Sequence, residues 1–201
     1  MYLESNLPSM NEYLGNLEFR YASILVLPSH SSNYFDTIMK CLIYVKQANP
    51  TLNEFNSWFC NEYNVCKNNS YNSRKILERA NLILLGADTN LRLTIEGEKC
   101  FVDDPRIIIS NCFVDAYEGM LEIVILLEKN TVSTKKALFN IWYKQYTESF
   151  KSIRNLNTCK HQFNILFKYL VNFNLIIESP QGGLSLNHQI ISNLFCSSYI
   201  Y

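Results

Sequence analysis

The chain has 201 residues, of which 48% are hydrophobic, so it can form one large domain or two small ones around a buried core. Lys and Arg together number 18, as do Asp and Glu, and the formal net charge is 0. This balance excludes a histone-like protein that binds nucleic acid through bulk positive charge. It is compatible with a binder whose basic residues gather on one face.

The seven cysteines are scattered, and none of them belongs to a CxxC motif. This pattern favours free thiols in a reducing compartment and argues against a zinc site. No apolar run approaches the roughly 18 residues of a membrane span, and the first residues lack the features of a secretory signal. We therefore expect an intracellular, cytoplasmic protein with no metal, no cofactor and no membrane contact.

Residues 1–32 are predicted to form an N-terminal arm. They contain two prolines, Pro8 and Pro28, and one apolar run over residues 23–27. That run could be a strand or an arm packed on the body of the protein. The arm is favoured because no partner strand is near in the sequence.

The next segment predicts two helices. Apolar residues recur at helical spacing over residues 33–47, with Asn33 placed as the N-cap. After a break at Pro50, Thr51 and Glu54 match a capping box at the start of a second helix. A polar turn over residues 67–70 is expected to follow it.

A third helix and a β-hairpin complete this unit. Apolar and small residues of the helix share one face at i, i+3, i+4 and i+7, and Asn81 is suited to the left-handed conformation that ends a helix. Residues 82–85 and 91–94 then predict two short strands. A helix followed directly by a hairpin is typical of the last helix and wing of a winged helix-turn-helix.

The plan repeats in the second half of the chain. Helices are predicted over residues 118–128, after a cap at residues 131–134, and after Asn157 or Thr158. Strands follow at residues 175–178 and 184–186. An offset of 93 residues aligns Asn81 with Asn174 and Leu77 with Leu170.

We therefore predict a mainly α protein with short β-hairpins (α+β), built from two tandem winged helix-turn-helix modules and a helical connector that packs between them. The predicted parts are an arm (1–32), module 1 (33–94), the connector (95–117), module 2 (118–187) and a C-terminal helix or tail (188–201).

The third helix of each module is the expected DNA-binding element, because in winged helices it enters the major groove. Asn can pair with adenine and Arg with guanine, while Lys holds phosphates. The predicted contacts are the polar and basic residues of these helices and of the segments ahead of them: Lys67, Asn69, Asn72, Arg74, Lys75, Arg79, Arg154, Lys160, His161, Gln162, Asn164 and Lys168. The predicted wing tips carry no Arg or Lys, which argues against strong backbone contact there.

Two segments carry a resemblance to a known family. The first is Leu93-Thr94-Ile95-Glu96-Gly97-Glu98 followed by Asp104-Pro105 and Gly119-Met120-Leu121-Glu122-Ile123, and the second is Gln162…Leu166…Leu170…Asn174-Leu175-Ile176. Together they resemble the tandem winged-helix recognition region of type IIS restriction endonucleases such as FokI, with Asn174 where a glycine is usual. The resemblance implies a sequence-reading module of a restriction or defence system.

No catalytic motif supports an enzyme. Glu96-Gly97-Glu98-Lys99 lacks the preceding Pro-Asp strand of a nuclease metal site, and no Walker A motif is present. His30, His161 and His188 lie far apart. We expect sequence-dependent binding of double-stranded DNA without catalysis, with a nuclease or other effector on a partner chain.

Two other functions stay open. Tandem winged helices can serve as a protein scaffold that bridges subunits. The neutral net charge and the absence of Lys and Arg from the predicted wing tips favour this role. A small transcriptional regulator that dimerises through its tail is a third possibility. The oligomeric state is not indicated by the sequence.

Overall fold

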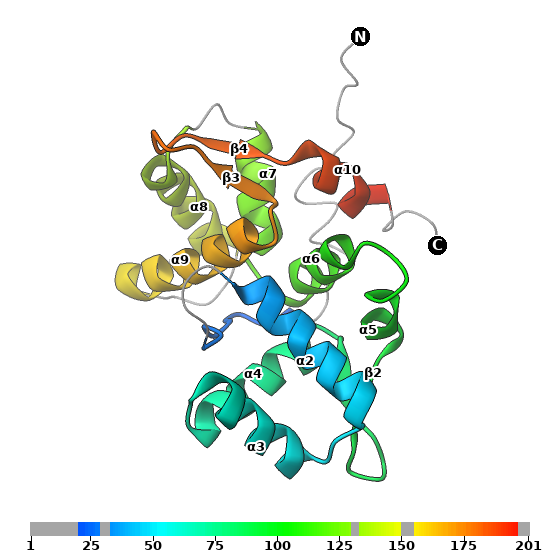
Figure 1. Cartoon of the computed structure of the whole chain (residues 1–201). Coiled ribbons are helices and arrows are strands. Elements are labelled where there is room, and N and C mark those ends of the chain that lie inside the picture. Colours follow the sequence, from blue (N-terminus) through cyan, green and yellow to red (C-terminus); the bar gives the residue numbers. More distant parts are fainter. Residues whose placement is uncertain (1–19, 29–32, 130–132, 150–154, 197–201) are drawn as a thin grey trace.

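The structure is a computed structural model that describes residues 20–28, 33–129, 133–149 and 155–196 (Figure 1). It confirms the coarse α+β prediction, because it is mainly helical with two small antiparallel hairpins. In chain order the elements are α2 (Tyr34–Ala48), α3 (Leu52–Tyr63), α4 (Lys67–Arg79), β1 (Ile83–Leu85), β2 (Leu91–Leu93), α5 (Ile95–Lys99), α6 (Pro105–Ala116), α7 (Met120–Lys129), α8 (Lys135–Ser149), α9 (Leu156–Asn172), β3 (Ile176–Glu178), β4 (Leu184–Leu186) and α10 (His188–Cys196).

Several helix ends follow from local chemistry, and those at Thr51 and Asn81 are as predicted. The Thr51 hydroxyl accepts from the backbone N–H of Glu54, whose carboxylate accepts from the Thr51 N–H in return. Asn81 and Asn174 have φ values of 52° and 62°, which end α4 and α9 in the left-handed conformation. Helix α6 begins at Pro105, where Asp104 caps the Arg106 N–H.

Two predicted helix starts were wrong. The expected polar turn over residues 67–70 is the first turn of α4, and a hydrogen bond of 2.8 Å from the Ser70 hydroxyl to Asn56 on α3 holds it in place. This tertiary contact overrides the weak helix propensity of Asn and Ser. Helix α9 is capped by Asn155, whose side chain accepts from Thr158 N–H at 2.8 Å, and not by Asn157 or Thr158.

The two hairpins repeat at the predicted offset of 93 residues. Ile83 pairs with Leu93 in the first hairpin, and the equivalent Ile176 pairs with Leu186 in the second. Each second strand also donates a hydrogen bond to the connection between the first two helices of its half, from Leu91 to Pro50 O and from Leu184 to Ser133 O. The halves therefore share their hydrogen-bond pattern as well as their element order.

Helices α5 and α10 extend this repeat beyond each hairpin. Thr94 N–H donates to Leu82 O at 3.1 Å, and Asn187 N–H donates to Leu175 O at 3.0 Å, again 93 residues later. Each of these residues directly precedes a helix. The predicted connector and tail therefore begin with equivalent helices.

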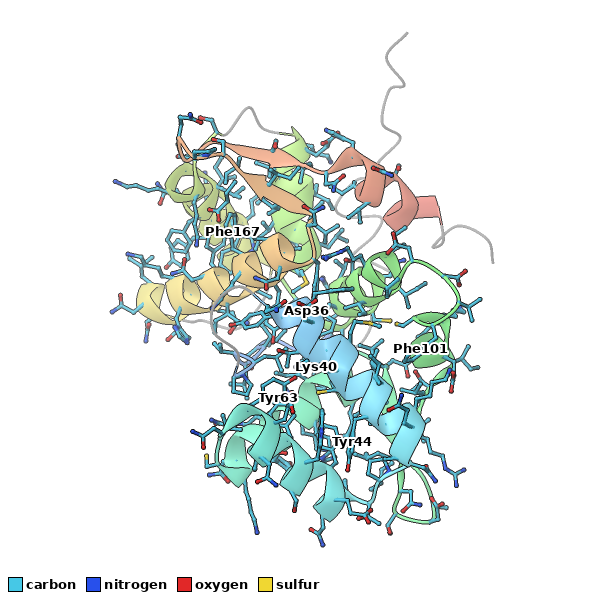
Figure 2. All side chains as sticks on the ribbon, in the orientation of Figure 1. Asp36, Lys40, Tyr44, Tyr63, Phe101 and Phe167 are labelled. Atoms are coloured by element: carbon cyan, nitrogen blue, oxygen red, sulfur yellow. The ribbon has the colours of Figure 1, made fainter. Side chains whose placement is uncertain are left out.

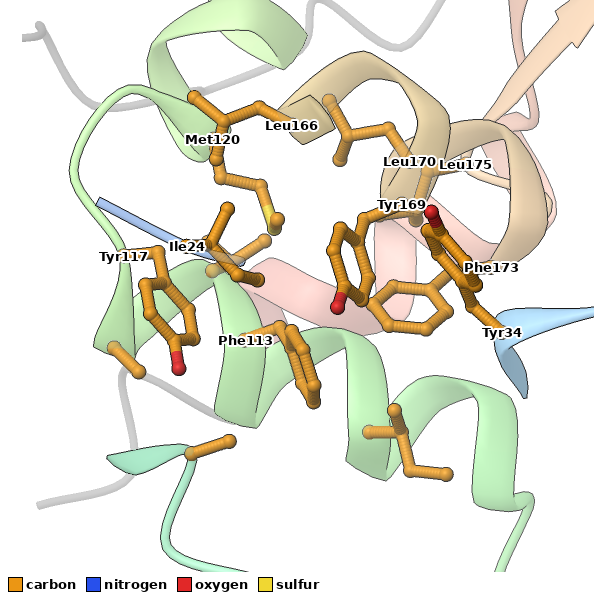
Figure 3. Close-up of a cluster of buried hydrophobic side chains, with 14 of the residues drawn as sticks. Ile24, Tyr34, Phe113, Tyr117, Met120, Leu166, Tyr169, Leu170, Phe173 and Leu175 are labelled. Atoms are coloured by element: carbon orange, nitrogen blue, oxygen red, sulfur yellow. The ribbon is translucent and has the colours of Figure 1, made fainter. Parts of the chain in front are cut away.

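The halves share one hydrophobic core, in which α6 is the central helix (Figure 3). The Phe113 ring lies 5.3 Å from that of Tyr169 and 5.0 Å from that of Phe173, both in the α9 region. Tyr34, at the start of α2, lies 4.6 Å from Tyr169 and its N–H donates to Asn172. Helix α6 of the predicted connector therefore packs against α9 within this common core.

The described part of the N-terminal arm packs on this core. Arg20 and Glu122 form an ion pair of 2.6 Å in which each side chain is only 3% exposed. Ile24 and Leu27 are buried, and Tyr21 forms a single bridge with Tyr117. Residues 20–28 therefore form a packed arm and not a strand, while residues 1–19 and 29–32 of the prediction lie outside the described residues.

We expect Asn81→Ala and Asn174→Ala each to lower the free energy of unfolding by about 1 kcal/mol, because a Cβ without a compensating polar group is strained at positive φ. Asn→Gly at the same sites should be neutral or stabilising. Urea unfolding would test this, with the exposed helical Asn61→Ala as the control. Equal stability of the Ala and Gly variants would contradict the assigned backbone conformation.

Phe113→Ala should cost about 3–5 kcal/mol, since it opens a cavity between the halves. Trp58 reports on the first half and Trp142 on the second, so single-tryptophan variants can follow each by fluorescence during urea unfolding. We expect both midpoints to move together. A shift in one probe alone would show that the halves unfold separately.

Candidate nucleic-acid interface

Positive charge is concentrated on three helices. Helices α4, α8 and α9 contain nine of the 18 Lys and Arg residues but only two of the 18 Asp and Glu residues. The rest of the chain is correspondingly acidic. The neutral total therefore conceals a separation of charge between parts of the molecule, of the kind that favours an anionic partner at the basic helices.

Helix α4 presents a polar, basic side to solvent. Because its apolar side packs on the core, the opposite side exposes Tyr71 to 50% and leaves Asn72 and Lys75 partly accessible. Lys67, Asn69 and Arg79 are exposed near its two ends. Six side chains of this one helix are thus exposed or partly exposed.

Arg74 does not belong to this surface, which corrects the predicted contact. Its side chain is 7% exposed and pairs with Glu78, which also accepts from Lys75 at 2.6 Å. The repeat contained the missed signal, because the offset of 93 aligns Arg74 with Phe167, a buried residue of α9. Arg74 in the first half and its equivalent Phe167 in the second therefore both face inward.

The packed arm extends the α4 surface. Tyr21 and Leu25 line a hollow of 350 Å³ together with Tyr71, Lys75 and Arg79. The Arg79 guanidinium lies 4.6 Å from the Tyr21 ring, which holds it beside the arm. The blue segment in Figure 1 runs between α4 and α9. The sequence predicted a packed arm but not its position beside this helix.

Helix α9 is exposed mainly in its first half. Lys160, His161 and Asn164 face solvent there, whereas Gln162 is only 6% exposed and is wrongly predicted as a contact. Gln162 faces inward because the shared core surrounds α9 on several sides. Arg154 lies outside the described residues.

The second half of α9 is covered by α2. Lys168 is half-buried, with its ammonium 4.8 Å from the Tyr34 ring, and Tyr34 N–H donates to Asn172. A helix covered in this way cannot lie along a DNA groove over its whole length. This cover could not be predicted from the sequence, because it depends on contacts between residues far apart in the chain.

A groove between α8 and α9 was missed by the sequence analysis. It has a volume of 490 Å³ and is lined by three lysines, three asparagines and three apolar residues: Lys135, Lys136, Lys160, Asn140, Asn157, Asn164, Phe139, Leu156 and Phe163. Partial burial lowers the pKa of the Lys135 ammonium, and the nearby Glu178 carboxylate opposes that shift. The signal in the sequence was the pair Lys135-Lys136 directly after the predicted cap.

The hairpins add little positive charge. In the first, Arg92 pairs with Asp88 at 2.6 Å, so the one basic side chain of that hairpin is neutralised. This ion pair holds the pKa of Asp88 below its usual range. The helices, and not the hairpins, carry the candidate interface.

Comparisons of the chain with protein-family models, with curated proteins and with solved structures found no match. Within the described residues, no helix combines the length and the apolar character needed to cross a membrane. The same residues contain no group of three or more His, Cys, Asp or Glu side chains placed to hold a metal ion. The six cysteines with described side chains are free thiols.

We expect Arg74→Ala to lower the free energy of unfolding by about 1–3 kcal/mol, because it removes the buried partner of Glu78. Arg79→Ala should change stability by less than about 0.5 kcal/mol, since its side chain is exposed. Urea unfolding of the two variants, whose arginines lie five residues apart on the same helix, provides the comparison. Equal effects would contradict the different environments of the two arginines.

Proposed function

We propose that the chain binds double-stranded DNA in a sequence-dependent manner through two tandem winged-helix units, α2–β2 and α7–β4. The observation that carries this proposal is the exposed side of α4, where Lys67, Lys75 and Arg79 stand beside Asn69 and Asn72. A helix of 13 residues with such a side can enter a major groove. Its only acidic residue, Glu78, is engaged by Arg74 and Lys75.

The side chains divide into two roles in this proposal. Lys67, Lys75 and Arg79 are spread along α4 and would hold phosphates on both sides of the groove. Asn69 and Asn72 lie between them and would contact base edges, for which carboxamides are suited. Tyr71, which is 50% exposed, supplies apolar contact in the same region.

The second unit contributes less to duplex binding. Lys160, His161 and Asn164 in the first half of α9 are accessible, but α2 covers the second half. We therefore propose α4 as the main recognition helix and α9 as an accessory contact. The rigid core would fix the angle at which both reach the DNA.

The setting of this activity is also a proposal. The resemblance to the recognition region of type IIS restriction endonucleases supports a sequence-reading subunit of a restriction or defence system in the cytoplasm. Cleavage or another effector activity would then belong to a partner chain, because the chain carries none of the catalytic motifs considered above.

A scaffold function is the second candidate, favoured by an exposed apolar cluster around α5. Ile95 is 78% exposed and Val102 85%, and Phe101 beside them is 36% exposed. Figure 2 shows Phe101 on the side of the molecule away from Phe167. A protein partner could bind there while α4 binds DNA, so the two candidates use different surfaces.

Binding to a pool of random duplex DNA, measured by gel shift at low and moderate salt, tests the DNA proposal. The triple variant Lys67→Ala, Lys75→Ala, Arg79→Ala should weaken binding at least about 100-fold at low salt and reduce the salt slope by about 3. Selection from the pool should enrich a motif with the wild-type protein.

The matched control removes three exposed lysines from other parts of the surface: Lys40→Ala, Lys46→Ala, Lys99→Ala. Each of these lysines pairs with a carboxylate in the structure. This variant has the same net charge as the test variant and should bind nearly as well as wild type. Equal weakening in both, or no binding by wild type at the lowest salt, would refute the proposed α4 interface.

A further inference from the structure

The α8–α9 groove has the size and composition of a small-ligand site. Its 490 Å³ falls within the roughly 300–1,000 Å³ typical of ligand pockets. It lies in the second half of the chain, apart from the α4 surface. Its lining contains no carboxylate, although half of all charged residues in the chain are acidic.

Two lysines of the groove, Lys136 and Lys160, are exposed, whereas Lys135 is partly buried with its ammonium 4.4 Å from the centre of the Phe167 ring. Within the described part of the chain, Lys135, Lys136 and Lys160 make no ion pair, whereas Lys40, Lys46 and Lys99 each contact a Glu carboxylate. Three ammonium groups around one hollow repel each other, and an anion between them would relieve that repulsion. Lysines are well suited to phosphate, which they bind as point charges.

The apolar lining residues indicate that the ligand carries an apolar group in addition to its negative charge. Phe139 and Phe163 have ring centroids 5.3 Å apart and meet edge to face at 64°. Phe163 is buried, so the partly exposed Phe139 ring, packed on it, supplies the accessible surface of this aromatic floor. Leu156, at the start of α9, is 51% exposed and extends the apolar surface. A planar apolar group can lie against such a floor, as nucleic-acid bases do on aromatic side chains.

The asparagines add hydrogen-bonding groups to the charge of the lysines and the apolar surface of the rings. Asn140, Asn157 and Asn164 are all exposed and project from both helices that form the groove. Each carboxamide offers donors and an acceptor, which match the mixed donor and acceptor edge of a base. Inorganic phosphate, by contrast, would use the lysines but neither the amides nor the rings.

We propose that the α8–α9 groove binds a nucleoside phosphate, with its phosphate on Lys135, Lys136 and Lys160 and its base between the aromatic floor and the asparagines. The ligand is a free nucleotide or an unpaired nucleotide of a single strand, which present the same groups. This site goes beyond duplex binding by α4 and does not depend on it.

The test measures two probes against one pair of substitutions. Adenosine 5′-monophosphate binding is followed by isothermal titration calorimetry, and binding of a fluorescein-labelled ten-residue deoxyadenosine strand is followed by fluorescence anisotropy. The variant Lys136→Ala, Asn140→Ala changes two exposed residues of α8 that are not part of the α4 surface. It should weaken the binding of whichever probe the groove accepts by about tenfold or more.

The control variant Lys40→Ala, Asn61→Ala removes the same two residue types from exposed positions of α2 and α3. Figure 2 shows Lys40 on α2, away from Phe167, whose ring lies 4.4 Å from the ammonium of the groove residue Lys135. This variant should bind both probes as wild type does. Duplex binding measured on the same samples should be nearly unchanged in the groove variant, which separates this site from the α4 interface.

The outcomes assign the source of the ligand. Binding of the monophosphate that is lost in the groove variant supports a free nucleotide, and binding of the strand alone supports an unpaired nucleotide in a polymer. If inorganic phosphate competes as well as the monophosphate does, the base is not recognised and the proposal is wrong. Absence of binding by both probes, or equal loss in the control variant, also overturns it.

Discussion

The packing of Phe113 between Tyr169 and Phe173 is the contact on which the arrangement of the whole molecule depends. It places α6 at the centre of a core that both halves share (Figure 3). Tyr34 joins the same cluster and brings the start of α2 onto α9. Each half contains three helices followed by a hairpin, and the shared core decides which sides of these helices stay accessible.

This constraint separates what the sequence predicts from what it does not. Caps at Thr51, Asn81 and Asn174 depend on neighbouring residues, so their chemistry could be recognised in the sequence. The burial of Gln162 depends on elements distant in the chain, and a list of polar residues on a helix cannot reveal it. Arg74 is an intermediate case, because its alignment with the apolar Phe167 indicates from the sequence that its position is buried.

The same reasoning applies to the candidate surfaces. The basic side of α4 could be predicted because one helix carries all of it. The α8–α9 groove could not, since its lysines and asparagines come from two helices whose facing sides are set by the packing of Phe139 on Phe163. A neutral total charge likewise says nothing of where acidic and basic residues lie, and here they occupy different helices.

The matching hairpin registers limit where this chain can change its length. Side chains alternate between the two faces of a strand, so one inserted or deleted residue in either hairpin would exchange its buried and exposed residues. The connection at Pro50 corresponds to Ser133 at a spacing of 83 residues, whereas Leu91 corresponds to Leu184 at 93. The ten-residue difference therefore lies in the segment that contains α8 and the start of α9. The two halves thus differ in length in their helical segment and have equal lengths in their hairpins, where a strand register must be kept.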